Sequence, residues 1–148
     1  SGLLHHLLGI RTQDELLAHP KCGASWEGYA IEEAIEVSQP DDMYFWATHQ
    51  GTELDLLLFK DGRRLGVEAK HADAPTLTRS MHIAVRDLKL EHLTVLYPGT
   101  QRYTLSDRVT VVPLTALAND GIETLFPKRK ARSGSNAPSQ GWSNRRAD

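Results

Sequence analysis

Asp55, Glu68 and Lys70 are the residues of this sequence whose types and spacing could support metal-assisted chemistry. They lie in two apolar segments joined by Asp61-Gly62, a dipeptide that is one of the strongest short signals for a β-hairpin. If the chain turns there, facing residues have numbers that sum to 123, so Asp55 faces Glu68. Side chains alternate between the two faces of a sheet, which predicts that Lys70 shares a face with Glu68.

The same register separates an ionisable face of the hairpin from an apolar one. Glu53 would face Lys70 on the ionisable side. Two facing carboxylates about 5 Å apart repel each other by roughly 3 kcal/mol at an effective dielectric of about 20, more than a favourable cross-strand pair returns. A shared proton, the Lys70 ammonium or a bound cation could offset this repulsion. The predicted apolar face carries Leu54, Leu56, Leu58, Val67 and Ala69.

A bound cation is the alternative that points to an activity. Mg²⁺ is a hard ion that takes oxygen ligands and is commonly held by one or two carboxylates, with water completing its shell. We therefore predict that Asp55 and Glu68 bind Mg²⁺ or Mn²⁺. Water on such an ion is more acidic, and a neighbouring Lys70 could orient it or stabilise negative charge on a phosphate. The alternative without a cation site is a solvent-exposed strand that happens to carry a Glu-x-Lys pattern.

Glu27 is predicted to join this site from a helix. Between about residues 24 and 37, apolar residues recur with the helical period and fall on one face. Glu27 lies near the middle of that face, where a carboxylate needs a partner. A helix packed on the ionisable face of the hairpin would aim Glu27 at the same spot as Asp55 and Glu68.

The remaining elements must hold this hairpin in place. Thr12 and Glu15 have capping-box spacing and predict a short helix that ends before His19-Pro20. The resulting order of helix, three antiparallel strands, helix and strand predicts an α/β fold of the α+β type with a mixed sheet. Further strands are predicted over residues 43–48, 93–97 and 109–112, and further helices over residues 78–90 and 114–119.

Length and charge predict one folded domain and a tail. A chain of 148 residues with 40% apolar content is long enough for one ordinary core. We predict a domain over residues 1–126 and a disordered basic tail over residues 127–148. Residues 1–127 carry a net charge near −7, and residues 128–148 one near +5. So acidic a domain is poorly suited to bind duplex DNA alone, because phosphate neutralisation supplies most non-specific affinity.

Several classes of protein and site are disfavoured by the sequence. Cys22 is the only cysteine, so neither an internal disulfide nor a thiolate metal cluster can form within one chain. Without a long apolar run or a signal-peptide pattern, we expect a soluble cytoplasmic protein with no membrane partner. His49, near the turn before Glu53, is the one histidine that we consider as an auxiliary to the site. The others are scattered without zinc-like spacing, including His5, His6, His71, His82 and His92.

The pattern of Asp55, then Glu68-Ala69-Lys70 after a turn, with Glu27 on a preceding helix, resembles the PD-(D/E)xK phosphodiesterase superfamily. The restriction-endonuclease-like core of that superfamily has the same order of helix, three strands, helix and strand. Residues 51–55 and 67–70 look more closely like the C-terminal domain of unknown function attached to many prokaryotic AAA+ ATPases. Leucine at position 54 departs from the proline of the superfamily's name.

The resemblance implies roles for the four residues. Asp55 and Glu68 would be the metal ligands, Lys70 the catalytic lysine and Glu27 the helical acid of a nuclease-like domain that, if active, hydrolyses nucleic-acid phosphodiesters. The alternative is a non-catalytic regulatory or partner-binding module of the ATPase. In either case the resemblance implies that an ATPase module precedes Ser1, and no G-x-x-x-x-G-K-[ST] loop is present in this sequence.

Overall fold

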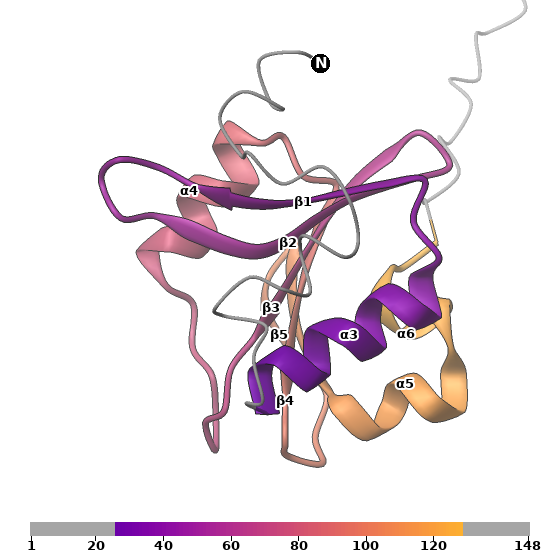
Figure 1. The fold of residues 1–148 in the computed structure, drawn as a ribbon. Helices are drawn as coiled ribbons and strands as arrows, with labels where there is room; N and C mark the ends of the chain where they lie inside the picture. The colour runs from indigo at the N-terminus through magenta and orange to yellow at the C-terminus, as the bar shows by residue number, and fades with distance from the viewer. Residues whose placement is uncertain (1–25, 129–148) are drawn as a thin grey trace, which may run out of the picture.

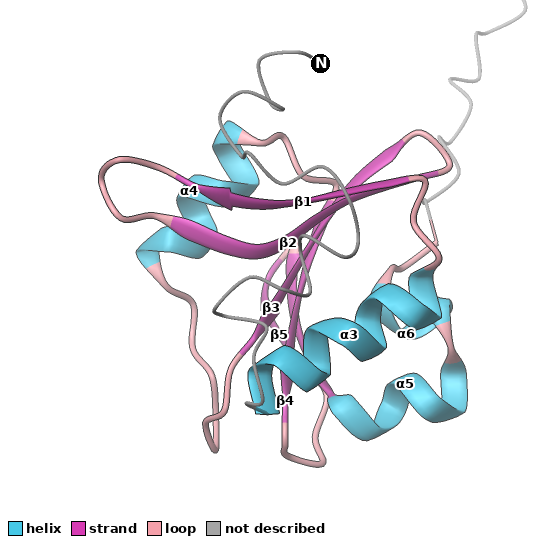
Figure 2. Cartoon of the chain, in the orientation of Figure 1, coloured by secondary structure: helices cyan, strands magenta, loops and turns pink. Residues whose placement is uncertain are grey.

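The computed structural model describes residues 26–128, in which helices pack on the two faces of one sheet (Figures 1 and 2). Their order begins with a helix, three strands, a helix and a strand, as the sequence predicts. The elements are α3 (Trp26–Ser38), β1 (Asp42–Ala47), β2 (Glu53–Lys60), β3 (Arg63–Ala69), α4 (Arg79–Asp87), β4 (His92–Tyr97), β5 (Tyr103–Ser106), β6 (Val109–Pro113), α5 (Leu114–Asp120) and α6 (Ile122–Leu125).

The sheet has six strands in the order β1-β2-β3-β4-β6-β5. The first three strands pair antiparallel, β4 pairs parallel with β3 and with β6, and the edge strand β5 pairs antiparallel with β6. Helix α4 lies in the crossover between β3 and β4, because two parallel neighbours need a long connection. The predicted α+β fold with a mixed sheet is therefore confirmed.

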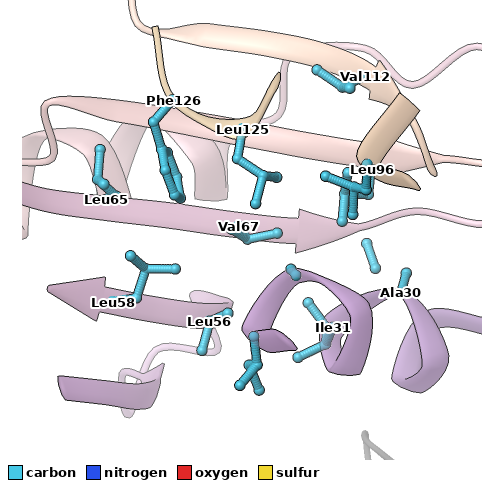
Figure 3. Close-up of a cluster of buried hydrophobic side chains, with 14 residues drawn as sticks. Ala30, Ile31, Leu56, Leu58, Leu65, Val67, Leu96, Val112, Leu125 and Phe126 are labelled. Carbon is cyan, nitrogen blue, oxygen red and sulfur yellow. The ribbon is translucent and has the colours of Figure 1, made fainter. Parts of the chain in front are cut away.

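Helices cover both faces of the sheet. Figure 1 shows α4 on one side and α3, α5 and α6 on the other. The side of α3 carries one buried apolar cluster, and Figure 3 shows side chains of the sheet meeting those of the helices there, such as Val67, Ile31 and Leu125. A second cluster, with Leu57 and Met81, fills the side of α4. We call these faces the α3 side and the α4 side.

The hairpin of β2 and β3 turns at Asp61 and Gly62, as predicted. Both residues have positive φ, 51° and 72°, which is the signature of a two-residue turn whose twist matches the flanking strands. The two strands pair from Lys60 with Arg63 to Leu56 with Val67, and every pair sums to 123. The register read from the turn is confirmed over this length.

Two elements were not predicted from the sequence. Strand β5 has only four residues and lies at the edge of the sheet, and α6 is a single turn. Neither is long enough for its apolar residues to show a clear period. The helix predicted near Thr12 and the tail from residue 129 onward lie outside the described residues. Among residues 26–128, none of the helices is long and apolar enough to cross a lipid bilayer.

Candidate functional site

In strand β2, the alternation of side chains between the two faces of the sheet is interrupted near Asp55. Tyr44 of β1 pairs with Leu57, whereas Trp46, two residues on, pairs with Leu54, so β2 holds one extra residue at this point. Such a bulge bends the strand and moves the following side chains to the other face. Leu54 accordingly packs on the α4 side together with Leu57, while Leu56 packs on the α3 side. The prediction of one apolar face that includes Leu54 is wrong for this reason.

The bulge also changes how Asp55 meets β3. The ladder between β2 and β3 ends one pair before Asp55 and Glu68. Ala69 N–H instead donates to Asp55 Oδ2 at 3.0 Å, whereas the next amide, that of Lys70, donates to Leu96 O of β4. The Asp55 carboxylate thus takes the place of a backbone acceptor on the β2 side of β3. It lies against the backbone of the residue between Glu68 and Lys70.

Glu68 is a buried carboxylate beside a half-exposed ammonium. Its side chain is 4% exposed, that of Lys70 is 43% exposed, and Glu68 Oε2 lies 3.6 Å from Lys70 Nζ. Val67 and Ala69 pack on the α3 side, so alternation directs Glu68 and Lys70 toward the α4 side. The structure therefore brings Asp55, Glu68 and Lys70 together where β3 ends, with Lys70 as one source of compensating charge.

Glu27 also lies at the end of β3, but helix α3 packs on the other face of the sheet from the one predicted. Helix α3 packs on the side of Leu56 and Val67, not on the side to which Glu68 points, and Glu27 is exposed in its first turn. The predicted burial of Glu27 and the predicted face for α3 are wrong, because both faces of the sheet are apolar and α3 covers the other one. Glu27 Oε1 still accepts a hydrogen bond from His71 N–H, 3.4 Å away, and the Trp26 ring lies 5.5 Å from the His71 ring.

Glu53 and His49 are two further residues that the sequence associates with this site. Glu53 pairs with Ala47 of β1, so the predicted pairing of Glu53 with Lys70 is not part of the ladder. His49 is exposed in the loop between β1 and β2. Within residues 26–128, no three His, Cys, Asp or Glu side chains form a group that could hold a metal ion. A site of two carboxylates completed by water stays a prediction.

Sequence reasoning did not identify a polar cavity at the opposite end of the sheet, near His92 and Arg102. It was missed because β5 and α6, which border it, were not predicted. The available signal was three threonines in or beside apolar segments, Thr94, Thr104 and Thr110. The periodicity of each segment does not show that these residues are neighbours across strands.

Comparison with known families gives one match over most of the chain. Residues 22–117 match the family described as a domain of unknown function, DUF4143. This range includes Glu27, Asp55, Glu68 and Lys70 and ends within α5. No solved structure matches the chain significantly.

Two curated relatives are uncharacterized proteins, one from Mycobacterium bovis and one from Mycobacterium tuberculosis. Each is 43% identical to this chain over 121 residues, which cover 82% of the chain. The chain spans only 27% of the length of either relative.

Proposed function

The chain belongs to the DUF4143 family of domains of unknown function, and from this premise we propose that it is a nuclease-like domain whose Asp55 and Glu68 bind Mg²⁺ or Mn²⁺. Domains of this family are known as C-terminal domains of AAA ATPase-like proteins. We accordingly place an ATPase module N-terminal to this domain in the longer protein, and nucleic acid as its substrate. The observation that carries the proposal is the meeting of Asp55, Glu68 and Lys70 at the end of β3.

The donor set at this end of the sheet suits a hard divalent cation. Asp55 and Glu68 supply carboxylate oxygens from adjacent strands, and such oxygens are the ligands that Mg²⁺ prefers. When bound, the ion would supply an acidified water and positive charge for a phosphate oxygen. Two carboxylates leave most of the coordination shell to water and substrate, as is usual for Mg²⁺ in phosphate chemistry.

The chain's own residues would position and neutralise the reacting groups. The hydrogen bond from Ala69 N–H fixes the Asp55 carboxylate at the end of β3. Lys70, half-exposed beside Glu68, can donate from its ammonium to a phosphate oxygen that approaches from solvent. Glu27, held at His71 N–H, adds a further acid at the rim and would favour a cation over a bare phosphate.

A second candidate function is supported by the same contacts. Asp55 and Glu27 each accept a hydrogen bond within the protein, from Ala69 N–H and His71 N–H, and Glu68 forms an ion pair with the Lys70 ammonium at 3.6 Å. Carboxylates that are paired in this way can serve the fold alone. The domain would then be a non-catalytic regulatory or partner-binding module of the ATPase, and it would fold normally without affinity for divalent ions.

A cleavage assay separates the two candidates. The full chain is incubated with end-labelled single-stranded and duplex DNA and RNA, with Mg²⁺, with Mn²⁺ or with a chelator. The nuclease proposal predicts cleavage that needs the divalent ion and falls at least about 100-fold in Asp55→Asn and in Lys70→Ala. Glu32→Gln, which removes an exposed carboxylate of α3, is the matched control and should cleave like the wild type. If none of these substrates is cleaved in a metal-dependent way, the second candidate is favoured.

A further inference from the structure

A cavity of about 370 Å³ lies at the end of the sheet where β4 begins, beneath the edge strand β5 and the short helix α6. This end is opposite to that of Asp55 and Glu68, since β3 ends beside the end of its parallel neighbour β4. Figure 1 shows α6 on the same side of the sheet as α3. The polar side chains that line the cavity belong to His92, Arg102, Thr104, Thr110, Glu123 and Thr124.

A row of threonine side chains forms the floor of this region. Thr94 of β4 pairs with Thr110 of β6, which pairs with Thr104 of β5, so the three residues are neighbours across three strands. The Thr94 hydroxyl donates to Leu125 O of α6, which accounts for its complete burial. Thr104 and Thr110 line the cavity. Three adjacent strands thus present hydroxyls where the rest of this face is apolar.

Thr124 of α6 is a further threonine of the lining. Its side chain is buried, at 3% exposure, and its Oγ1 makes no hydrogen bond within the part of the chain that the structure describes. A buried hydroxyl without a partner is unfavourable and rare in native proteins. The Thr124 carbonyl accepts a hydrogen bond from Arg102 NH2, so a guanidinium lies beside this hydroxyl. Thr124 belongs to the lining, but its Oγ1 is screened from solvent, so a ligand supplies the missing partner only if the Thr124 side chain shifts toward the cavity.

His92 is buried near two arginines, Arg63 and Arg102. Burial, Arg63 and Arg102, in that order, lower the pKa of His92 to about 4, so the imidazole is neutral at pH 7. A neutral imidazole offers one N–H donor and one acceptor. Glu91 pairs with Arg63 at 2.7 Å, and this pair lies beside the start of β4.

Glu123 also lines the cavity and would repel an anion there. It is exposed, and its carboxylate pairs with the Lys128 ammonium at 3.2 Å, which compensates much of its charge. Within residues 26–128, Arg102 is thus the charged group of the lining that forms no ion pair with a carboxylate.

We propose that this cavity binds a small oxyanion, a phosphate or carboxylate group, held by Arg102 and by the hydroxyls of Thr104, Thr110 and Thr124. Phosphate and carboxylate share the acceptor oxygens that a guanidinium and hydroxyl donors recognise. The volume exceeds that of a single inorganic phosphate, so it leaves room for a small group attached to the oxyanion. This binding does not depend on a cation site at the other end of the sheet.

Phosphate and succinate titrations of the full chain test the proposal. The ring resonances of His92 are followed by NMR, with sodium chloride at equal ionic strength as the reference. A bound anion offsets the influence of the two arginines, so saturable binding should raise the pKa of His92 from about 4 toward its ordinary value of 6.5. Saturation with only one of the two anions would identify which oxyanion the cavity prefers.

Three variants locate the binding. Thr124→Val replaces the buried hydroxyl with a methyl group and should fold at least as well as the wild type, yet bind the anion about 10-fold more weakly. Arg102→Gln should weaken binding further. Arg79→Gln removes an exposed charge on α4 and should leave binding unchanged.

Shifts that follow chloride as closely as phosphate and succinate, or that persist unchanged in Thr124→Val, would overturn the proposal. If Arg102→Gln does not fold, Thr124→Val and the pKa of His92 in the wild type still decide the question.

Discussion

The two ends of the sheet differ in how their buried ionisable groups are compensated. At the end of β3, Asp55 accepts a hydrogen bond from a backbone N–H, and Glu68 forms an ion pair with an ammonium. At the start of β4, His92 is buried as a neutral base near two arginines, and the Thr124 hydroxyl has no hydrogen bond within residues 26–128. The carboxylates of the first end are compensated by groups of the protein, while the second end holds a neutral imidazole near arginines and a buried hydroxyl. Stability should therefore respond differently to pH and mutation at the two ends.

The largest effect is expected at His92 when the pH falls. Its pKa is about 4 in the folded protein against 6.5 ordinarily, so between these values the unfolded chain binds a proton that the folded chain does not. The free energy of unfolding should fall below about pH 6.5 and level off near pH 4, by roughly 3 kcal/mol in all. Urea denaturation at about pH 7 and about pH 4.5 measures this loss.

His92→Gln is the control for this prediction. The variant has no imidazole at position 92, so it should lose less stability between the two pH values than the wild type by most of that amount. Equal losses in the two proteins would mean that His92 is not held neutral and that the contrast between the two ends is false.

The next effect is expected at Asp55. Asp55→Ala leaves the Ala69 N–H, in a residue only 1% exposed, without its acceptor and should lower stability by about 2 kcal/mol. Asp55→Asn keeps an acceptor oxygen at the same place and should lose less than about 1 kcal/mol. Amide exchange at Ala69 should speed up in Asp55→Ala alone. If Asp55→Asn instead stabilises the protein, a shared proton or unrelieved repulsion among the carboxylates would explain this end better.

A smaller effect is expected at Lys70. Lys70→Met removes the ammonium beside the buried Glu68, but the ammonium is half-exposed and screened by solvent, so the loss should be about 1 kcal/mol. Lys70→Arg keeps the charge and should lie closer to the wild type. The loss in Lys70→Met should shrink at high salt, because screening weakens the pair in the wild type. A loss that does not depend on salt would speak against an electrostatic role.

Glu27 should have the smallest effect. Glu27→Gln keeps an acceptor for His71 N–H at an exposed position, so stability should change by less than about 0.5 kcal/mol. Chemical denaturation measures this change. A larger loss would show that the charge of Glu27, and not its hydrogen bond alone, holds α3 to the end of β3.

Local signals in the sequence are enough to predict the hairpin and its register. The turn at Asp61-Gly62 needs two positive φ values, which this dipeptide readily adopts, and the pairs from Lys60–Arg63 to Leu56–Val67 follow from it. The period of α3 is equally local. These local features alone predict that Asp55, Glu68 and Lys70 lie near one another.

Non-local pairing decides what the sequence does not reveal. The bulge at Asp55 arises from the pairing of β2 with β1, and it turns a facing carboxylate pair into a carboxylate that receives the Ala69 N–H. The position of Glu27 depends on which apolar face of the sheet α3 covers. The cavity near His92 needs β5 and α6, which are too short to show a period.

The most direct test of the proposed function is a titration of the full chain with Mg²⁺ and with Mn²⁺, followed by residue-resolved NMR on the wild type and Asp55→Asn. We expect saturable changes at Asp55, Glu68 and Lys70, absent from the variant and absent around His92 in both proteins. If no resonance at the end of β3 changes up to about 10 mM metal, the cation site does not exist and the non-catalytic, partner-binding alternative is favoured.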